Sequence, residues 1–302
     1  MCDLTFSFRQ PFVSSRVPSV SEDMAREALL KFVGKKWTYS SKPARNLVFK
    51  DLKPYTVYRY RLETYTESRS SAWDCEPHTD QFVDGPQYGQ SPPPWAVAVE
   101  GPPMYTDLTQ KVRVPHSSFV KVSAPGNTLV RMLDQHVTGV MGEEGCDVIT
   151  AMEEKECNHC HAKGHRCCTS CSGHRNLMHY IVLTITWKNH VFEFIPDRVP
   201  DFPVKKFEKV SGDPFFIDES ILVYPIVGFP DQDICSESRR IIEEHLNKFS
   251  SMSRILQQRQ TIEVVPLTQA FYSYNGKNYD YFVFGFENKV HAPKYPSSCS
   301  IL

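Results

Sequence analysis

A helical stripe of apolar residues is the first strong pattern in the chain. Residues 1–20 are rich in serine and proline and are predicted to be disordered, and the sequence SEDMAREALLKFVGKK follows from Ser21 as a helix. Ser21 is suited to cap the N-terminus of this helix, and Gly34 is suited to the position just after its last turn. The apolar residues that should face a core are Ala25, Ala28, Leu29, Phe32 and Val33.

Alternation of apolar and polar residues predicts strands over the next hundred residues. In TVYRYRLETYTE we expect Tyr58, Tyr60 and Leu62 on one face of a strand. The charged residues of the opposite face are Arg59, Arg61 and Glu63. A proline-bounded strand is expected in SPPPWAVAVEGPP (91–103), and another strand is expected in KVRVPHSSFVKV (111–122).

The C-terminal part of the chain combines strands, one helix and a hairpin. YIVLTITWKNHVFEFIP predicts two strands around a turn at Lys188–Asn189, and residues 236–258 are predicted to form a helix. Asn275–Gly276 separates two aromatic-rich strand sequences, which indicates a type I′ hairpin. The aromatic residues here favour a packed core over a platform for stacking bases. The predicted fold class is α+β: a β-rich scaffold, formed by residues 21–122 and 176–298, interrupted by a small cysteine-rich zinc hairpin.

Length, charge and hydropathy narrow the class of protein. The 302 residues suffice for two domains, or for one larger domain with a module. The hydrophobic content of 41% and the charged content of 23% are ordinary for a globular protein, and a formal net charge of −1 gives no overall attraction to nucleic acid or membranes. No apolar run approaches the ~18 residues that a membrane span needs, and the N-terminal sequence does not resemble a signal peptide. A cytoplasmic or nuclear protein with reduced cysteines is therefore predicted.

Cysteines concentrate in the segment ECNHCHAKGHRCCTSCSG. Four of them follow the spacing Cys157-x2-Cys160-x7-Cys168-x2-Cys171. Each C-x2-C turn directs two thiolates at one point, and two such turns suit a tetrahedral Zn²⁺. Such a site is coordinatively closed and therefore structural, and the chain as written has one at most. The alternatives are a reduced loop without metal and a nucleophilic Cys167 or Cys168 beside the neighbouring histidines.

Other features bear on function more weakly. Positive charge around the cysteines, which favours contact with nucleic acid as a second function, comes from Lys155, Lys163, Arg166 and Arg175. The chain is predicted not to be an enzyme, because it contains no phosphate-binding loop, no G-x-G-x-x-G, no H-E-x-x-H and no G-x-S-x-G. His116 is expected to be a structural loop residue, and Cys75 and Cys235 are expected to be ordinary thiols.

Six stretches together resemble the Ssu-2 homolog family: SEDMAREALLKFV, YRYRLETYTESR, VDGPQYG, VPHSSFVK, YPIVGFP and LQQRQTIEVVPLT. The resemblance covers roughly residues 21–120 and 155–299. It implies a β-rich scaffold interrupted by a region similar to the zinc module of DnaJ-type chaperones, which is built from C-x-x-C-x-G-x-G units. Here Ala162 and Arg175 stand where two of those glycines belong. The chain has no His-Pro-Asp tripeptide, so the function of a J domain is not implied, and no enzymatic activity follows from the resemblance.

Residues 123–156 match nothing in the family pattern. In an alternative reading frame, each codon combines the last base of one present codon with the first two bases of the next. From His136 onward, the codons that can encode this chain permit the following product in that frame: C-H-G-C-H-G-R-G-R-V-R-C-H-Y-C-H-G-R. This product repeats the C-x2-C-x7-C-x2-C spacing. We therefore hypothesise that residues from about 125 to 155 are translated out of frame, which would remove a further zinc-binding unit.

Residues 299–302 fit the prenylation motif C-a-a-X, with Cys299 as the acceptor and a terminal leucine that favours a geranylgeranyl group. Only Lys289 and Lys294 are basic nearby. One prenyl chain on Cys299 would therefore give weak, reversible membrane attachment.

These features predict a non-enzymatic, zinc-containing protein that binds other polypeptides, as a chaperone-like protein or a scaffold. Residues 157–175 form its zinc module, with Cys157, Cys160, Cys168 and Cys171 as ligands. The alternative is a nucleic-acid-binding or gene-regulatory protein that uses the basic finger.

Overall fold

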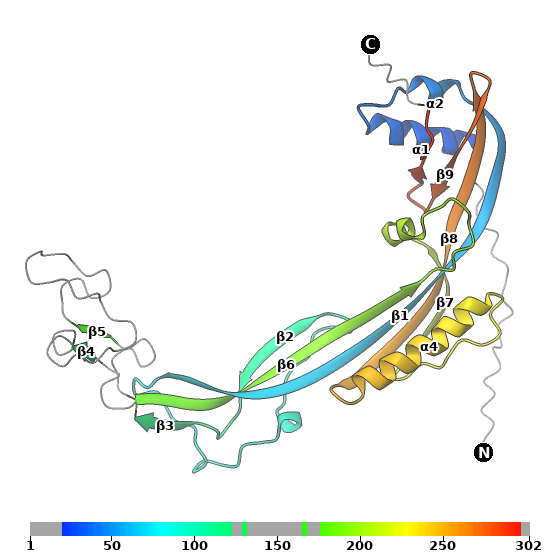
Figure 1. The fold of residues 1–302 in the computed structure, drawn as a ribbon. Helices are drawn as coiled ribbons and strands as arrows, with labels where there is room; N and C mark the ends of the chain where they lie inside the picture. Colours follow the sequence, from blue (N-terminus) through cyan, green and yellow to red (C-terminus); the bar gives the residue numbers. More distant parts are fainter. Residues whose placement is uncertain (1–19, 123–128, 132–164, 168–175, 297–302) are drawn as a thin grey trace, which may run out of the picture. The chain divides into compact units, whose positions relative to one another are not determined.

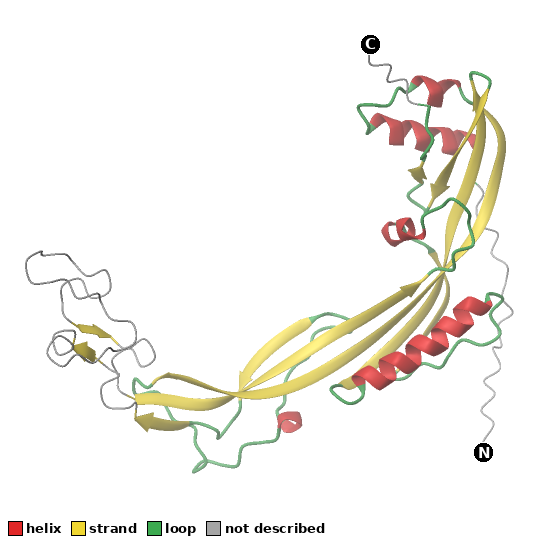
Figure 2. Ribbon diagram, in the orientation of Figure 1, coloured by secondary structure: helices red, strands yellow, loops and turns green. Residues whose placement is uncertain are grey.

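The computed structural model describes residues 20–122, 129–131, 165–167 and 176–296. These residues form a β-rich fold with a few helices, as predicted for the scaffold (Figure 2). The zinc hairpin falls outside the described residues.

The chain divides into two compact units, which are described separately. Unit 1 consists of Met1–Thr66, Met104–Thr106 and Lys188–Leu302. Unit 2 consists of Glu67–Pro103 and Asp107–Trp187. Two long strands, β1 (Val48–Pro77) and β6 (Asn176–Phe194), contribute residues to both units.

In unit 1 the strand order is β10-β9-β8-β1-β6, and β7 pairs with β8 on the same edge as β9 (Figure 1). The remaining strands of this unit are β7 (Asp213–Ser220), β8 (Arg254–Tyr274), β9 (Lys277–Phe284) and β10 (Lys289–His291). The predicted hairpin at Asn275–Gly276 is confirmed, because Tyr274 pairs with Lys277 across it. Both turn residues have positive φ, 48° and 72°, as a type I′ turn requires.

The N-terminal helix α1 (Glu22–Gly34) begins as predicted, because Ser21 Oγ accepts a hydrogen bond from the backbone N–H of Met24 at 3.3 Å. Its apolar stripe packs into a core that also contains β8 and β9 residues. The prediction for Gly34 is wrong. The capping residue is Lys35, in right-handed backbone conformation, so this helix ends without a left-handed glycine. A short helix, α2 (Lys42–Asn46), follows.

A longer helix, α4 (Gln232–Phe249), covers one face of the unit 1 strands (Figure 2). The predicted range of 236–258 is wrong at both ends. The helix starts earlier because the Asp231 side chain accepts from the backbone N–H of Asp233 at 3.0 Å. It stops at Phe249, whose carbonyl accepts from the Ser253 hydroxyl at 2.8 Å, and β8 starts at Arg254.

In unit 2 the strand order is β1-β6-β2, and β3 pairs with β6 beside β2. The one strand predicted for 111–122 is two strands, β2 (Leu108–Arg113) and β3 (Phe119–Val122), because the chain turns at His116, where φ is 59°. The strand predicted for 91–103 is wrong. This segment is a loop with one 3-10 turn, η1 (Pro94–Ala96), because its prolines lack the N–H donors that a strand needs.

The turn predicted at Lys188–Asn189 is also wrong, because β6 runs through both residues. Asn189 Nδ2 donates to Glu63 Oε1 at 3.0 Å, and the Thr66 hydroxyl donates to the backbone oxygen of Lys188 at 3.4 Å. These contacts attach Lys188 and Asn189 of β6 to the neighbouring strand β1, so the chain continues as one strand through both residues.

Candidate functional site

The predicted zinc ligands Cys157, Cys160, Cys168 and Cys171, and the predicted prenylation site Cys299, lie outside the described residues. In the ranges that the structure does describe, no three His, Cys, Asp or Glu side chains are grouped so that they could hold a metal ion. Cys75 is exposed and Cys235 half-buried, and both are free thiols, as expected.

The cysteine-rich segment leaves and re-enters the scaffold at one point. Val122, the last residue of β3, is directly paired with Asn176, the first residue of β6. Further into the segment, β4 (Leu129–Arg131) pairs with β5 (His165–Cys167). Residues 123–175 are therefore an insertion between two adjacent antiparallel strands of unit 2, and the scaffold continues on both sides of it.

An aromatic cluster lies on the strands at the base of this insertion. Phe119 on β3 is directly opposite His179 on β6, and their rings stack with centroids 5.3 Å apart. Trp73 on β1 meets Phe119 edge-on at 5.6 Å. Trp73 is 61% exposed and Phe119 43% exposed, so the cluster offers apolar ring surface to solvent. We call Trp73, Phe119 and His179 the aromatic cluster below.

The long loop of unit 2 exposes further aromatic residues. Phe82 and Tyr88 pack on each other at 4.9 Å while both remain exposed. Trp95 lies under the guanidinium of Arg69 at 5.0 Å. Single exposed rings are common on protein surfaces, but grouped ones are informative, because aromatic residues are enriched where proteins bind one another.

His116 fixes this loop. Its Nδ1 lies 2.8 Å from Asp84 Oδ1, and its backbone N–H donates to Asp84 Oδ2 at 2.9 Å. The hydrogen bond from the His116 backbone, followed by that from its ring, holds the pKa of Asp84 below its usual value. His116 also accepts the Ser91 hydroxyl at its carbonyl. These contacts agree with the predicted structural role of this residue.

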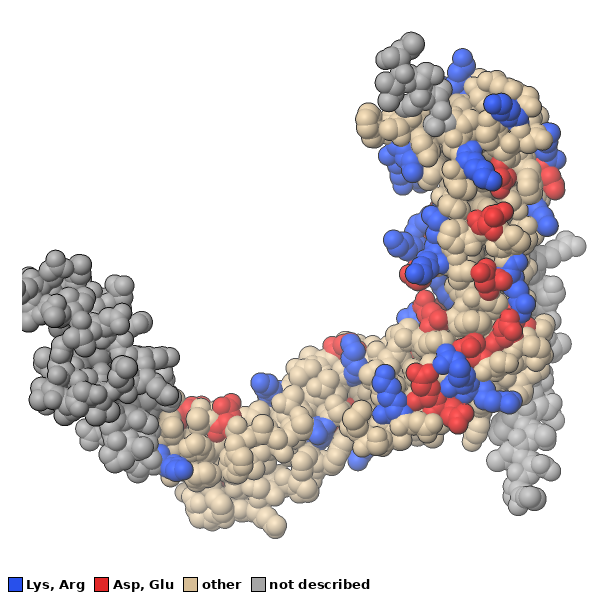
Figure 3. Space-filling model, viewed as in Figure 1, with Lys and Arg blue, Asp and Glu red and all other residues tan. Residues whose placement is uncertain are grey.

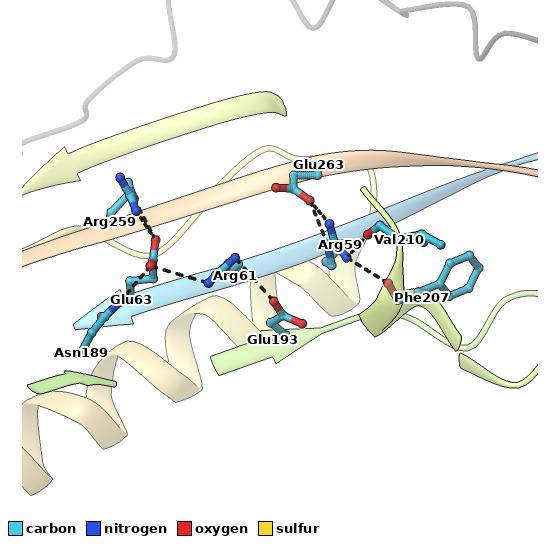
Figure 4. A network of polar contacts seen from close by, with 9 residues as sticks. All are labelled: Arg59, Arg61, Glu63, Asn189, Glu193, Phe207, Val210, Arg259 and Glu263. Carbon is cyan, nitrogen blue, oxygen red and sulfur yellow. Dashed lines mark hydrogen bonds and ion pairs between the residues drawn. The ribbon is translucent and has the colours of Figure 1, made fainter. Parts of the chain in front are cut away.

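Unit 1 contains a network of charged residues on β1, β6 and β8 (Figure 4). Three arginines, Arg59, Arg61 and Arg259, face three glutamates, Glu63, Glu193 and Glu263. The sequence predicted the strand face correctly but not its burial, since Arg59 is 8% and Glu63 5% exposed. With three charges of each sign the network is balanced, and it joins neighbouring strands rather than forming a charged ligand site.

The Arg59 guanidinium donates four hydrogen bonds in this network. Its Nε and Nη2 donate to Glu263, and its Nη1 donates to the carbonyls of Phe207 and Val210 at 3.0 and 2.9 Å. Those carbonyls belong to or follow the 3-10 turn η2 (Val204–Lys209), so Arg59 also fixes this turn to the sheet.

A second polar chain lies under α4. Gln258 Nε2 donates to the Thr64 hydroxyl at 3.0 Å, and that hydroxyl is 2.8 Å from His245 Nδ1. Burial, together with the nearby His190, lowers the pKa of His245 to about 4, so its ring is neutral at physiological pH. A neutral, hydrogen-bonded histidine is suited to a structural role.

Fold and site together define a class of protein: a β-rich scaffold with a cysteine-rich insertion between two paired strands and an exposed aromatic cluster at its base. The chain is 41% identical to the human protein SSUH2 homolog over 307 aligned residues, which cover 94% of this chain and 80% of the human one. It is 36% identical to the SSUH2 homolog of Danio rerio over 94% of this chain and 82% of the fish protein. This chain therefore belongs to the SSUH2 homolog family, as the sequence motifs predicted.

Comparison with family models and with solved structures gave no match. Within the described ranges, no helix combines the length and the apolar character that crossing a bilayer requires.

Proposed function

We propose that the chain is a non-enzymatic, zinc-containing protein that binds other polypeptides through the aromatic cluster at the base of its cysteine-rich insertion. The observation that carries this proposal is the contact between two exposed rings, Trp73 and Phe119, on the two strands β1 and β3 that flank β6. Phe119 lies three residues before the end of β3. Rings in this setting bury large apolar area against an extended segment at little cost in side-chain entropy. We place the protein in the cytoplasm or nucleus.

Zinc is the second part of the proposal. Cys157, Cys160, Cys168 and Cys171 would hold one structural Zn²⁺, whose binding would stabilise the folded form of the insertion. Metal analysis of the purified chain should then find one zinc per chain, and Cys160→Ser with Cys168→Ser should remove it. Cys75→Ser with Cys235→Ser is the matched control, because both thiols lie in the scaffold. A zinc content that the control lowers equally would contradict the assignment.

The reading frame affects the number of zinc ions. If the transcript across codons 120–157 is translated in the alternative frame, the intact product carries a further four-cysteine unit. Its zinc content should then be at least two per chain. A transcript whose codons cannot encode those cysteines would end this hypothesis.

Polypeptide binding is tested with a client that stays unfolded, reduced and carboxymethylated α-lactalbumin carrying a fluorophore. The anisotropy of the client should rise on addition of the chain. The variant Trp73→Ser with Phe119→Ser should weaken this binding at least about tenfold, the effect expected for central aromatic contacts. The control is Trp37→Ser with Tyr224→Ser, which removes two more exposed rings, 98% and 76% exposed, from unit 1. Equal loss in both variants, or none in either, would contradict the proposal.

Salt dependence separates this proposal from the alternative. Client binding through aromatic rings should change little between low and moderate salt. Nucleic-acid binding through Lys155, Lys163, Arg166 and Arg175 would instead weaken steeply as salt is raised. Tight, salt-sensitive binding of a labelled RNA, without client binding, would favour the alternative of a nucleic-acid-binding or gene-regulatory protein.

We also propose that Cys299 is prenylated and gives weak, reversible membrane attachment. Cells supplied with a labelled isoprenoid should label the chain, and Cys299→Ser should abolish the label. A wild-type chain without label would remove this part of the proposal.

A further inference from the structure

A groove lined by lysines lies in unit 1 between α1, η2 and the turn from β9 to β10. Its volume is about 770 Å³, and it is open to solvent. Figure 3 shows Lys and Arg side chains on the part of unit 1 that carries α1 and η2. The six lysines that line the groove are Lys31, Lys35, Lys205, Lys206, Lys209 and Lys289.

Buried apolar residues also line the groove. Ala28, Phe284 and Val290 are buried in the cores that pack α1 and η2 against β9 and β10. The Arg59 guanidinium holds η2 to the sheet, as described above. Lys289 Nζ donates to the backbone oxygen of Lys209 and so joins β10 to η2. The lysines therefore stand on fixed elements on three sides of one cavity.

Positive charge dominates the groove. Six lysines and two glutamates, Glu208 and Glu287, give a formal charge of +4 (6 − 2). Glu287 is already engaged, because its carboxylate accepts from the Ser211 hydroxyl at 2.7 Å and from the Ser211 backbone N–H at 3.0 Å. None of the ion pairs formed among the described residues includes one of the six lysines.

The charge of Lys206 also acts on a neighbouring histidine. Burial is the main cause that lowers the pKa of His291, Lys206 lowers it further, and Asp280 opposes this shift. An excess of positive charge around a concave surface raises the local concentration of anions. The groove is thus suited to an anionic ligand.

We propose that this groove binds a ligand carrying several phosphate groups, of the kind found in a phosphorylated inositol. Lysine ammonium groups bind phosphate as point charges, and lysines on three sides of a cavity can reach phosphates that point in different directions. The volume lies in the range of small-molecule sites. This favours a compact polyanion over an extended nucleic-acid strand. The inference is independent of polypeptide binding, which uses unit 2.

The phosphates can belong to a free small molecule or to a lipid headgroup. The lipid source fits the position of the C-terminal segment, because Tyr295 packs in the same core cluster as α1, and its hydroxyl donates to the Ser40 carbonyl at 2.7 Å. The sequence alone placed two lysines near Cys299, whereas the fold assembles six around this groove. A basic site of this kind would supply the second signal that a single prenyl chain needs for stable attachment.

The test uses the full chain without a prenyl group and two probes. Calorimetric titration with inositol hexakisphosphate measures the free anion, and flotation with phosphatidylcholine vesicles containing phosphatidylinositol bisphosphate measures the headgroup. Lys31→Ser, Lys35→Ser and Lys205→Ser together should weaken binding at least about tenfold. The control, Lys42→Ser, Lys111→Ser and Lys277→Ser, removes the same charge from exposed positions outside the groove and should bind as the wild type does.

The outcomes either identify the source of the phosphates, a free small molecule or a lipid headgroup, or contradict the proposal. Binding of either probe that only the groove variant loses supports the proposal, and the probe that binds more tightly identifies the source. Absence of binding to both probes, or equal weakening in the control, would overturn it. Tighter binding of a single-stranded RNA at the same lysines would also overturn it, in favour of a nucleic-acid site. A cooperative urea transition in every variant confirms that the fold is intact.

Discussion

Arg59 shows how a single charged side chain is accommodated inside the sheet of unit 1. A buried guanidinium is costly unless its donors are satisfied, and Arg59 directs its donors to Glu263 and to two backbone carbonyls. His245 is also buried, but it avoids the cost of a buried charge because its ring is neutral. At the residue scale, both side chains owe their state to neighbours that are distant in sequence.

Arg59→Lys should destabilise unit 1 by about 2 kcal/mol. A lysine keeps the charge, but its single nitrogen cannot reach Glu263 and both carbonyls together, so buried acceptors lose their donors. Urea unfolding would measure the change. Arg198→Lys is the control, because Arg198 is exposed in its pairs with Asp231 and Asp233, and such pairs contribute little. Equal effects of the two substitutions would show that the burial of Arg59 is energetically unimportant.

Stability should fall as pH is lowered from about 7 to 5, partly because of His245. The pKa of this histidine is about 4 in the folded chain and 6.5 in the unfolded chain, so the unfolded state binds more protons between these values. The stabilisation is complete above pH 6.5 and is lost progressively toward pH 4. Between pH 7 and 5 the loss amounts to at most about 2 kcal/mol.

The control for this pH effect is His245→Gln, which cannot titrate but can still hydrogen-bond to Thr64. Because His190, Glu244 and Lys248 contribute to the field at His245, only the difference between wild type and variant isolates this group. The variant should show a smaller loss of unfolding free energy from pH 7 to 5. An identical pH dependence would contradict the assignment.

At the scale of elements, turns and caps decide where strands and helices end. The turn of the hairpin between β8 and β9 consists of Asn275 and Gly276, whose positive φ these two residue types adopt readily. The sequence alone therefore predicted this turn. The end of α1 was not predicted correctly, because Lys35 caps it in ordinary helical conformation. A second glycine with positive φ, Gly285, lies at the end of β9 with its φ at 70°.

Gly276→Ala and Gly285→Ala should differ in their cost, although both glycines have φ near 70°. An added Cβ at Gly276 meets no atom within 4 Å, so only backbone strain of about 1 kcal/mol is expected. An added Cβ at Gly285 would overlap the side chain of Val210, so the cost should reach about 3 kcal/mol. Thermal or urea unfolding of the two variants measures this difference, and equal costs would show that Val210 moves freely.

At the scale of the whole molecule, the insertion point between β3 and β6 separates scaffold from module. Because Val122 and Asn176 are paired, the strands on either side do not need residues 123–175 to bring them together. The aromatic cluster lies on the scaffold side of this point, whereas the predicted zinc ligands lie within the insertion.

Replacing residues 123–175 by a short turn containing Asn-Gly should leave the scaffold folded. The shortened chain should unfold cooperatively in urea with a midpoint close to that of the full chain, and should contain no zinc. The full chain, purified in parallel, is the control for both measurements. A shortened chain that is unfolded would show that the insertion is part of the scaffold core.

Local patterns in the sequence were enough to predict several elements. The Ser21 cap, the apolar stripe of α1 and the Asn275–Gly276 hairpin depend on neighbours within a few residues, and all three are confirmed. The family also followed from short motifs. The sequence also indicated that the cysteines lie in a segment between two β-rich regions, because strand patterns and cysteine spacing both depend on residues that are close together in the chain.

Tertiary structure decided the rest, because it depends on contacts between residues far apart in the chain. The continuity of β6 through Lys188–Asn189 depends on Glu63 and Thr66 of β1, and the burial of Arg59 depends on Glu263 and η2. The stacking of Phe119 on His179 and the gathering of six lysines around one groove likewise require strand register and helix packing. The sequence by itself determined which elements could form and which family they belong to. Only the fold determined which polar residues are buried and which surfaces are available to bind a partner.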